Sequence, residues 1–244
     1  MLVVLAAVVA GACQVHGEVA IDVAEDGSGT VEVRVVLDRE AARRLGDPAT
    51  AIRSDDLREA GWDVRDPERA EDGSLTLVGR RAFSGPDQLG PVLEEIGGSD
   101  GVFRAVSLRV EDGFGSAEYE LAATVHLTGS LEQFSDGELA AALDGLPLAR
   151  SPEELAAEGA DDPATATLGV SVELPGGTPR TTGSIEDGRA TWTFPVTGGE
   201  ATDEQIRVAT TTSSGRTGPL VITAAIAGVL ALVALVIGLL RRRS

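Results

Sequence analysis

The chain has 244 residues, of which 39 are acidic and 20 basic, and its formal net charge at pH 7 is −19. A protein this acidic cannot neutralise the phosphates of DNA or RNA, so the composition excludes a nucleic-acid binder. Its single cysteine excludes a disulfide framework, and one cysteine with two histidines leaves no tetrahedral zinc cluster. All basic residues are arginines and asparagine is absent, which indicates a GC-rich genome and carries no information about mechanism.

An apolar run, Leu2–Ala12, opens the chain and is too short to cross a bilayer. It ends in three small residues, Ala10, Gly11 and Ala12, directly before the single cysteine, Cys13. These positions resemble a bacterial lipobox, in which a signal peptidase cleaves before a cysteine that carries diacylglycerol. We therefore expect cleavage at this site and lipidation of Cys13. The alternative is an ordinary signal peptide followed by a buried free thiol.

A second apolar run, Leu220–Leu240, lies close to the other end and contains no charged residue. As a helix with a rise of about 1.5 Å per residue it is long enough to cross the ~30 Å hydrocarbon core of a bilayer. The run is followed at once by Arg241, Arg242 and Arg243, and such a basic cluster marks the cytoplasmic side. We therefore expect a transmembrane helix with the preceding residues outside the cytoplasm.

The segment between the two apolar runs is the predicted ectodomain. Neither run carries a charge and Arg241–Arg243 follow the second, so this segment is more acidic than the whole chain. Its last part, Thr210–Pro219, is small, polar and aperiodic, which predicts a flexible stalk. Two anchors in one membrane would keep the ectodomain close to the bilayer, whereas processing could leave a form with one anchor.

The tripeptide Glu-Asp-Gly occurs four times, each time between segments in which apolar and polar residues alternate. Asp-Gly supplies the positive φ that tight hairpin turns need, so each copy predicts a β-hairpin. None of the copies has the ligand spacing of an EF-hand calcium loop. The four copies are Glu25–Gly27, Glu71–Gly73, Glu111–Gly113 and Glu186–Gly188.

Short helices are predicted between the hairpins. Asp38 can cap a helix over Arg39–Leu45, and Ser54 can cap one through Leu57. A third helical segment runs from Gly85 to Ile96, and Pro91 should kink or split it. Hairpins interleaved with short helices indicate an α+β fold with a largely antiparallel sheet built from Asp-Gly hairpins, plus the one C-terminal transmembrane helix.

Two blocks of the sequence resemble a known family. The first is the lipobox followed by a strand, an Asp-Gly turn, the strand VEVRVVLD (Val31–Asp38) and the helix REAARRLG (Arg39–Gly46). The second is VSVELPG (Val170–Gly176) followed by DGRATW (Asp187–Trp192). Together with the C-terminal span, these blocks are similar to the LppM-type lipoproteins of actinobacteria. The resemblance implies a lipid-anchored α+β envelope domain that acts at a lipid or glycolipid interface, with no established enzyme activity.

Five aromatic residues are candidates either for an apolar pocket that holds an acyl chain or for the core of the domain. Neither histidine, His16 or His126, lies in an order typical of a catalytic triad, and no Gly-x-Ser-x-Gly elbow occurs. Adjacent acidic pairs such as Glu94 and Glu95 are expected to be solvated. We expect no catalytic residue, cofactor or metal. The aromatic candidates are Trp62, Phe83, Phe103, Phe134 and Trp192.

The sequence therefore favours a membrane-anchored envelope lipoprotein whose acidic ectodomain binds a lipid, a glycolipid or an envelope protein. One alternative is a structural or scaffold protein that binds no ligand, and another is a hydrolase of envelope polymers. The predicted segments are a signal peptide (1–12), an extracytoplasmic α+β domain (13–209), a stalk (210–219), a transmembrane helix (220–240) and a basic cytoplasmic tail (241–244).

Overall fold

The computed structural model describes residues 14–45, 54–97, 101–128, 165–196 and 201–213, which form two β-sheets and three helices. The first sheet has eight strands in the order β10-β11-β8-β1-β2-β5-β3, and β4 also pairs with β5. Its strands are β1 (Gln14–Val23), β2 (Gly29–Leu37), β3 (Asp63–Val64), β4 (Glu68–Arg69), β5 (Leu75–Phe83), β8 (Thr165–Glu173), β10 (Ser184–Glu186) and β11 (Arg189–Pro195).

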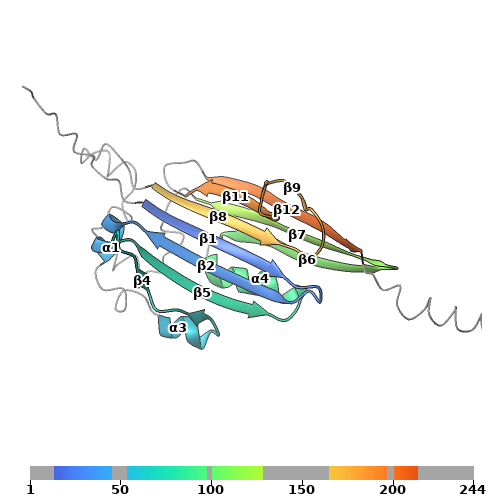
Figure 1. Ribbon diagram of the computed structural model, residues 1–244, viewed down its shortest axis with the longest axis horizontal. Helices are drawn as coiled ribbons and strands as arrows, with labels where there is room; N and C mark the ends of the chain where they lie inside the picture. The colour runs from blue at the N-terminus through green and yellow to red at the C-terminus, as the bar shows by residue number, and fades with distance from the viewer. Residues whose placement is uncertain (1–13, 46–53, 98–100, 129–164, 197–200, 214–244) are drawn as a thin grey trace, which may run out of the picture.

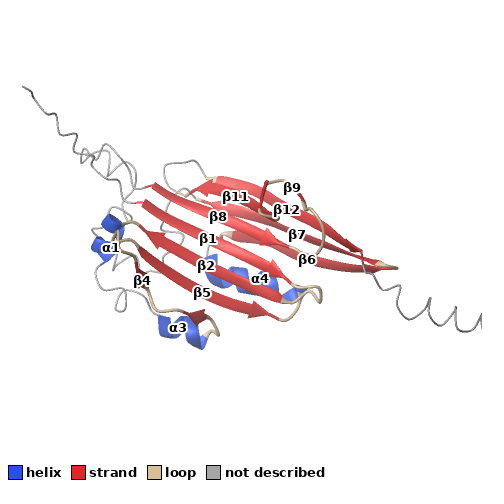
Figure 2. Cartoon of the chain, in the orientation of Figure 1, coloured by secondary structure: helices blue, strands red, loops and turns tan. Residues whose placement is uncertain are grey.

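The second sheet has four strands in the order β6-β7-β12-β9. Figure 1 shows this sheet beside and behind the first, with one helix, α4, behind β2 and β5. Strands dominate the described chain, as Figure 2 shows. The remaining elements are β6 (Phe103–Gly113), β7 (Ser116–Leu127), β9 (Arg180–Thr181), β12 (Thr202–Ser213), α1 (Arg39–Leu45), α3 (Ser54–Glu59) and α4 (Pro86–Gly97).

The larger of two hydrophobic core clusters lies between the first sheet and a second layer made of the four-stranded sheet and α4. The smaller one joins Leu37 and Leu75 of the first sheet to Ala41 and Ala42 of α1.

The alternation of apolar residues along each strand puts one face of the first sheet into these clusters. A single row across the sheet shows the pattern, since Val19 pairs with Val33 on one side and with Val170 on the other, and Val170 pairs with Trp192. Val19, Val170 and Trp192 are buried, whereas Val33 is only partly buried.

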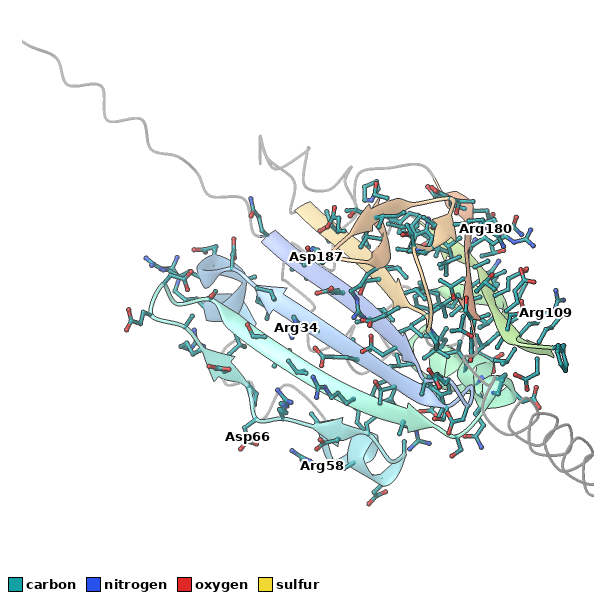
Figure 3. The ribbon with its side chains drawn as sticks, turned by 45° about the vertical axis from the view of Figure 1, so that its right-hand side comes forward. Arg34, Arg58, Asp66, Arg109, Arg180 and Asp187 are labelled. Carbon is teal, nitrogen blue, oxygen red and sulfur yellow. The ribbon has the colours of Figure 1, made fainter. Side chains whose placement is uncertain are left out.

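The opposite face of the first sheet is polar, and several of its charges are paired. Glu32 accepts hydrogen bonds from Arg34, at 2.8 Å, and from Arg80. Burial disfavours the ionised carboxylate of Glu32, but the two guanidinium partners outweigh it and hold the pKa of Glu32 below its usual range. Figure 3 shows Arg34 on this sheet, where it and Arg80 both pair with Glu32.

The two sheets are also joined by a buried tyrosine. The hydroxyl of Tyr119, on β7, donates a 2.8 Å hydrogen bond to the carbonyl of Glu25 in the β1–β2 turn. Burial, reinforced by the nearby acidic residues, raises the pKa of Tyr119, so this hydroxyl stays protonated as a donor. The bond fixes the β1–β2 turn against the second sheet.

Three of the four Glu-Asp-Gly copies form the turns that the sequence predicts. Gly27, Gly73 and Gly188 have positive φ, of 78°, 88° and 84°. In the first copy the Asp26 carboxylate accepts the backbone N–H of Ser28 at 3.0 Å. Asp72 accepts the N–H of Ser74 in the same way, at 2.9 Å.

The third copy, Glu111–Gly113, confirms its predicted hairpin, since β6 pairs with β7, but it does not form the turn itself. Glu111 and Asp112 lie in β6, and the turn consists of Phe114 and Gly115, whose φ is 85°. The physical reason is that the next glycine supplies the same positive φ two residues later. The hairpin is therefore longer than the sequence suggests.

Two of the helices match their predicted starts closely. The carboxylate of Asp38 accepts the N–H of Ala41 at 2.7 Å, which is the N-cap predicted for α1. α4 is one continuous helix through Pro91, where the sequence predicts a kink or a split. The predicted split is therefore wrong, and Pro91 itself lies on the exposed side of α4.

The fold class requires two corrections. The largely antiparallel sheet is in fact two sheets, and the first is mixed because β1 and β8 pair in parallel. The described chain is mainly β with few short helices. β12 also continues to Ser213, so Thr210–Ser213 is paired strand where the composition predicts stalk. Threonine fits the pleated surface of a strand well, which explains the extension.

The three helices of the described residues are all too short, or too polar, to cross a membrane. The predicted span 220–240 lies outside the described residues, and so do the signal peptide and the basic tail.

We expect Gly29→Ala to destabilise the protein by about 1–3 kcal/mol, because overpacking a core has a cost of this size. A Cβ at Gly29 would lie 2.1 Å from the carbonyl oxygen of Asp22 and 2.4 Å from the Phe83 ring. Urea unfolding of the purified protein measures the effect. Gly177→Ala is the matched control, since its Cβ would meet nothing within 4 Å, and equal midpoints for the two variants would contradict the prediction.

Candidate functional site

A cavity of about 390 Å³ opens on the core-side face of β2 and β5. Its floor consists of side chains that alternate along these two strands, Val33 and Val35 on β2 and Leu77 on β5. Gly79, which pairs with Val33, adds a position without a side chain. All four residues are partly buried, so this stretch of the core-side face is not covered by the second layer.

Three elements form the walls of the cavity. α3 contributes Leu57, the segment that includes β3 contributes Trp62 and Val64, and α4 contributes Ile96. Backbone hydrogen bonds hold this wall in place, because the N–H of Trp62 donates to the carbonyl of Leu57 at 2.9 Å. In a second backbone hydrogen bond, the N–H of Arg65 donates to the carbonyl of Val78 at 3.0 Å. The apolar wall is thus tied both to α3 and to the strand that forms the floor.

Charged side chains stand at the mouth of the cavity. Arg58, Arg65 and Asp66 all line it and are exposed. Figure 3 shows Arg58 and Asp66 near each other beside α3, and Arg58 Nη2 lies 4.0 Å from a carboxylate oxygen of Asp66. Arg58 also donates to the carbonyl of Val64 at 3.2 Å. The cavity therefore combines an apolar interior with a polar rim.

A buried tryptophan connects the cavity to a charged pair. The indole N–H of Trp62 donates to Glu95 Oε2 at 2.7 Å, and Glu95 Oε1 lies 3.7 Å from Arg81 Nη2. Trp62 is only 7% exposed, so its indole needs this partner. Glu95 thus fixes the orientation of the ring that forms one wall of the cavity.

Arg81 stands on the core-side face of β5, directly across from Val31. Its Nε is buried and has no hydrogen-bond partner among the described atoms. The guanidinium lies against Gly61, where a Cβ would fall 1.7 Å from Nη1. Gly61, whose φ is 89°, is therefore required both by its backbone conformation and by the space that Arg81 occupies.

The four aromatic candidates within the described residues, Trp62, Phe83, Phe103 and Trp192, are all buried in the larger core cluster, at 7%, 2%, 2% and 6% exposure. Of these four, only Trp62 also lines the cavity beside β2 and β5. The Trp192 indole donates to Thr182 Oγ1 at 3.3 Å. The other predicted site residues lie outside the described residues; they are Ala10, Gly11, Ala12, Cys13, Phe134, Arg241, Arg242 and Arg243.

The two histidines lie on different sheets and do not form a common site. His16 Nδ1 lies 2.8 Å from Thr167 Oγ1, on the outer face of the first sheet. His126 Nδ1 lies 2.7 Å from a carboxylate oxygen of Asp203, on the second sheet. Within the described ranges, no group of three or more His, Cys, Asp or Glu residues is placed to hold a metal ion.

Sequence reasoning missed the floor of the cavity and its charged pair. Val33, Val35 and Leu77 alternate like any core-facing residues, so nothing local marks them as partly uncovered. Glu94 and Glu95 are both exposed, as the sequence predicts, but nothing in the sequence indicates that Glu95 also accepts the hydrogen bond of Trp62. An arginine at an apolar position of a strand, Arg81, was the one available signal.

The NMR structure of the folded domain of the LppM protein of Mycobacterium tuberculosis is similar to this chain. The match has a TM-score of 0.39 and 14% sequence identity, and it covers 85% of this chain and 94% of that chain. It is in line with the LppM-type resemblance found in the sequence motifs. No family model and no curated protein matches the chain. At this similarity the match concerns the fold alone, and no residue role passes from that protein to this chain.

We expect Glu95→Gln to lower the free energy of unfolding by about 1 kcal/mol, because a charge-assisted bond to Trp62 becomes a neutral one and Arg81 loses its nearby carboxylate. Thermal or urea unfolding measures the change. Glu94→Gln is the control, since Glu94 is exposed on the same helix and should shift stability by less than about 0.5 kcal/mol. An equal shift in both variants would show that Glu95 has no special role.

Proposed function

We propose that the protein is an envelope lipoprotein whose ectodomain binds the acyl chain of a lipid or glycolipid in the cavity beside β2 and β5. The observation that supports this proposal is the apolar floor of the cavity, formed by Val33, Val35 and Leu77. These side chains lie on the core-side face of the first sheet and are nevertheless only partly buried. A volume of about 390 Å³ lies within the range of pockets that hold small ligands.

The chemistry of the cavity fits an amphiphile. Each methylene of an acyl chain that leaves water for the floor and walls contributes about 0.8 kcal/mol. A phosphate or a sugar at the other end of the ligand would meet the rim, where Arg58 and Arg65 supply guanidinium groups in an otherwise acidic chain. Asp66 and Glu95 supply acceptors for sugar hydroxyls.

The proposed role is binding and not catalysis. The chemistry-bearing residues near the cavity are arginines and carboxylates at its rim, and both histidines lie elsewhere in the fold. The proposal places the protein in the cell membrane, lipid-anchored at Cys13 and spanning once through 220–240. Such anchors would hold the cavity close to the lipids that it binds.

We expect Gly79→Leu to weaken binding of a fluorescent acyl-chain probe about tenfold or more. The new side chain would occupy the cavity floor and displace at least two methylenes of the ligand, each worth about 0.8 kcal/mol, against 1.4 kcal/mol for a factor of ten. Its Cβ would meet only the Trp62 ring, at an ordinary 3.5 Å. Fluorescence titration, with native mass spectrometry of extracted lipid, measures the loss.

Gly169→Leu is the matched control. Gly169 is also a glycine inside a strand of the first sheet, but it lies on the outer face beside His16, at a Cβ distance of 3.6 Å from that ring. This variant should bind the probe like the unmodified protein. Equal binding by both variants, with unchanged stability, would exclude the cavity as the binding site.

A further inference from the structure

The β6–β7 hairpin extends beyond the end of the first sheet. Tyr119 marks the level of the β1–β2 turn, because its hydroxyl donates to the carbonyl of Glu25. The hairpin continues past this level through the pair Glu111 and Glu118 to the pair Gly113 and Ser116. Figure 1 shows its tip as the outermost part of the described chain at that end.

A fully exposed aromatic residue occupies this tip. Phe114 has a relative exposure of 101%, and Leu57 and Ile185, the other exposed large hydrophobic residues of the described chain, reach 40% and 47%. Its neighbours Gly113 and Gly115 have no side chains that could cover the ring. Phe114 therefore contributes nothing to the core, and its ring is available to a partner outside the domain.

The chain leaves the domain toward the predicted membrane span at the same tip. Ser213, the last residue of β12, pairs with Ser116, two positions from Phe114. Only the residues 214–219 separate it from Leu220, where the apolar run begins. A chain of this length reaches at most about 25 Å when fully extended. The tip is thus tethered close to the point where the chain would enter the bilayer.

We propose that Phe114 inserts into the interface of the membrane and holds this end of the ectodomain against it. This inference rests on the proposed transmembrane span. Phenylalanine is among the apolar residues that membrane-surface proteins bury at the boundary between headgroups and hydrocarbon, and the glycine-flanked turn lets the ring enter without burying other side chains. One phenylalanine is too weak to recruit a soluble protein, but the tether gives an effective concentration on the order of millimolar.

The charges beside Phe114 select the lipid. Glu111 and Asp112 are exposed on the same hairpin, whereas the nearby Arg180 pairs with Glu118 at 3.2 Å. Anionic headgroups therefore repel the tip, and uncharged or zwitterionic headgroups do not. The contact should weaken as the anionic fraction of the membrane rises, and salt should partly restore it.

The test uses the full chain in phosphatidylcholine vesicles, with Cys13→Ser so that one engineered cysteine can carry an environment-sensitive fluorophore. In Phe114→Cys the label should shift to the blue, and nitroxide groups on the lipid chains should quench it. Adding phosphatidylglycerol at low salt should reverse both effects. The control is Glu71→Cys, in the exposed β4–β5 turn at the other end of the first sheet, whose label should stay in water.

Hydrogen exchange of the full chain without any label provides a second measurement. Exchange of the backbone amides near Phe114 should be slower in phosphatidylcholine vesicles than in vesicles rich in phosphatidylglycerol, and Phe114→Ser should abolish this difference. If the chain floats with the vesicles but both measurements show the tip in water, the inference about Phe114 is wrong, whereas the proposed transmembrane span still holds. If the chain does not float with the vesicles, the proposed span fails and this inference fails with it.

Discussion

The structure depends on a mismatch in width between two packed layers. The first sheet has eight strands, whereas the layer packed on it has four strands and one helix. The row through Trp192, Val170 and Val19 is buried, but its continuation through Val33 to Gly79 is not. Because the second layer ends before the sheet does, α1, α3 and the segment around Trp62 must cover the remaining face. They cover it incompletely, and the cavity is what remains.

The charged pair beside the cavity, Arg81 and Glu95, lies at the same edge of the second layer. Deep in a core an unpaired arginine would be costly, but Arg81 is partly exposed and lies between Glu95 of α4 and Gly61, next to Trp62. Glu95 reaches both groups, so one carboxylate orients the indole and lies near the guanidinium. The hydrogen bond between Glu95 and Trp62 therefore fixes the orientation of the cavity wall. The surface that this wall presents to a ligand stays apolar.

Local chemistry could be predicted from the sequence, and long-range pairing could not. The turns at Gly27 and Gly73 follow from Asp-Gly, and the N-cap at Asp38 follows from its side chain. The parallel pairing of β1 with β8 joins residues as far apart as 151 positions, for example His16 and Thr167, and leaves no local pattern. The cavity was missed for the same reason, since partial coverage of Val33 is decided by an element that is distant in sequence.

The ends of the described chain limit how the domain can stand on a membrane. β1 starts at Gln14, directly after Cys13, at the end of the first sheet opposite the β1–β2 turn, whereas β12 ends at Ser213, beyond that turn. At about 3.3 Å per residue these ends are roughly 40 Å apart along the strands. The residues 214–219 reach about 25 Å at most. A molecule that keeps both proposed anchors must therefore hold its strands closer to the membrane plane than to its normal, whereas one anchored only through 220–240 can stand upright on the tip of the β6–β7 hairpin.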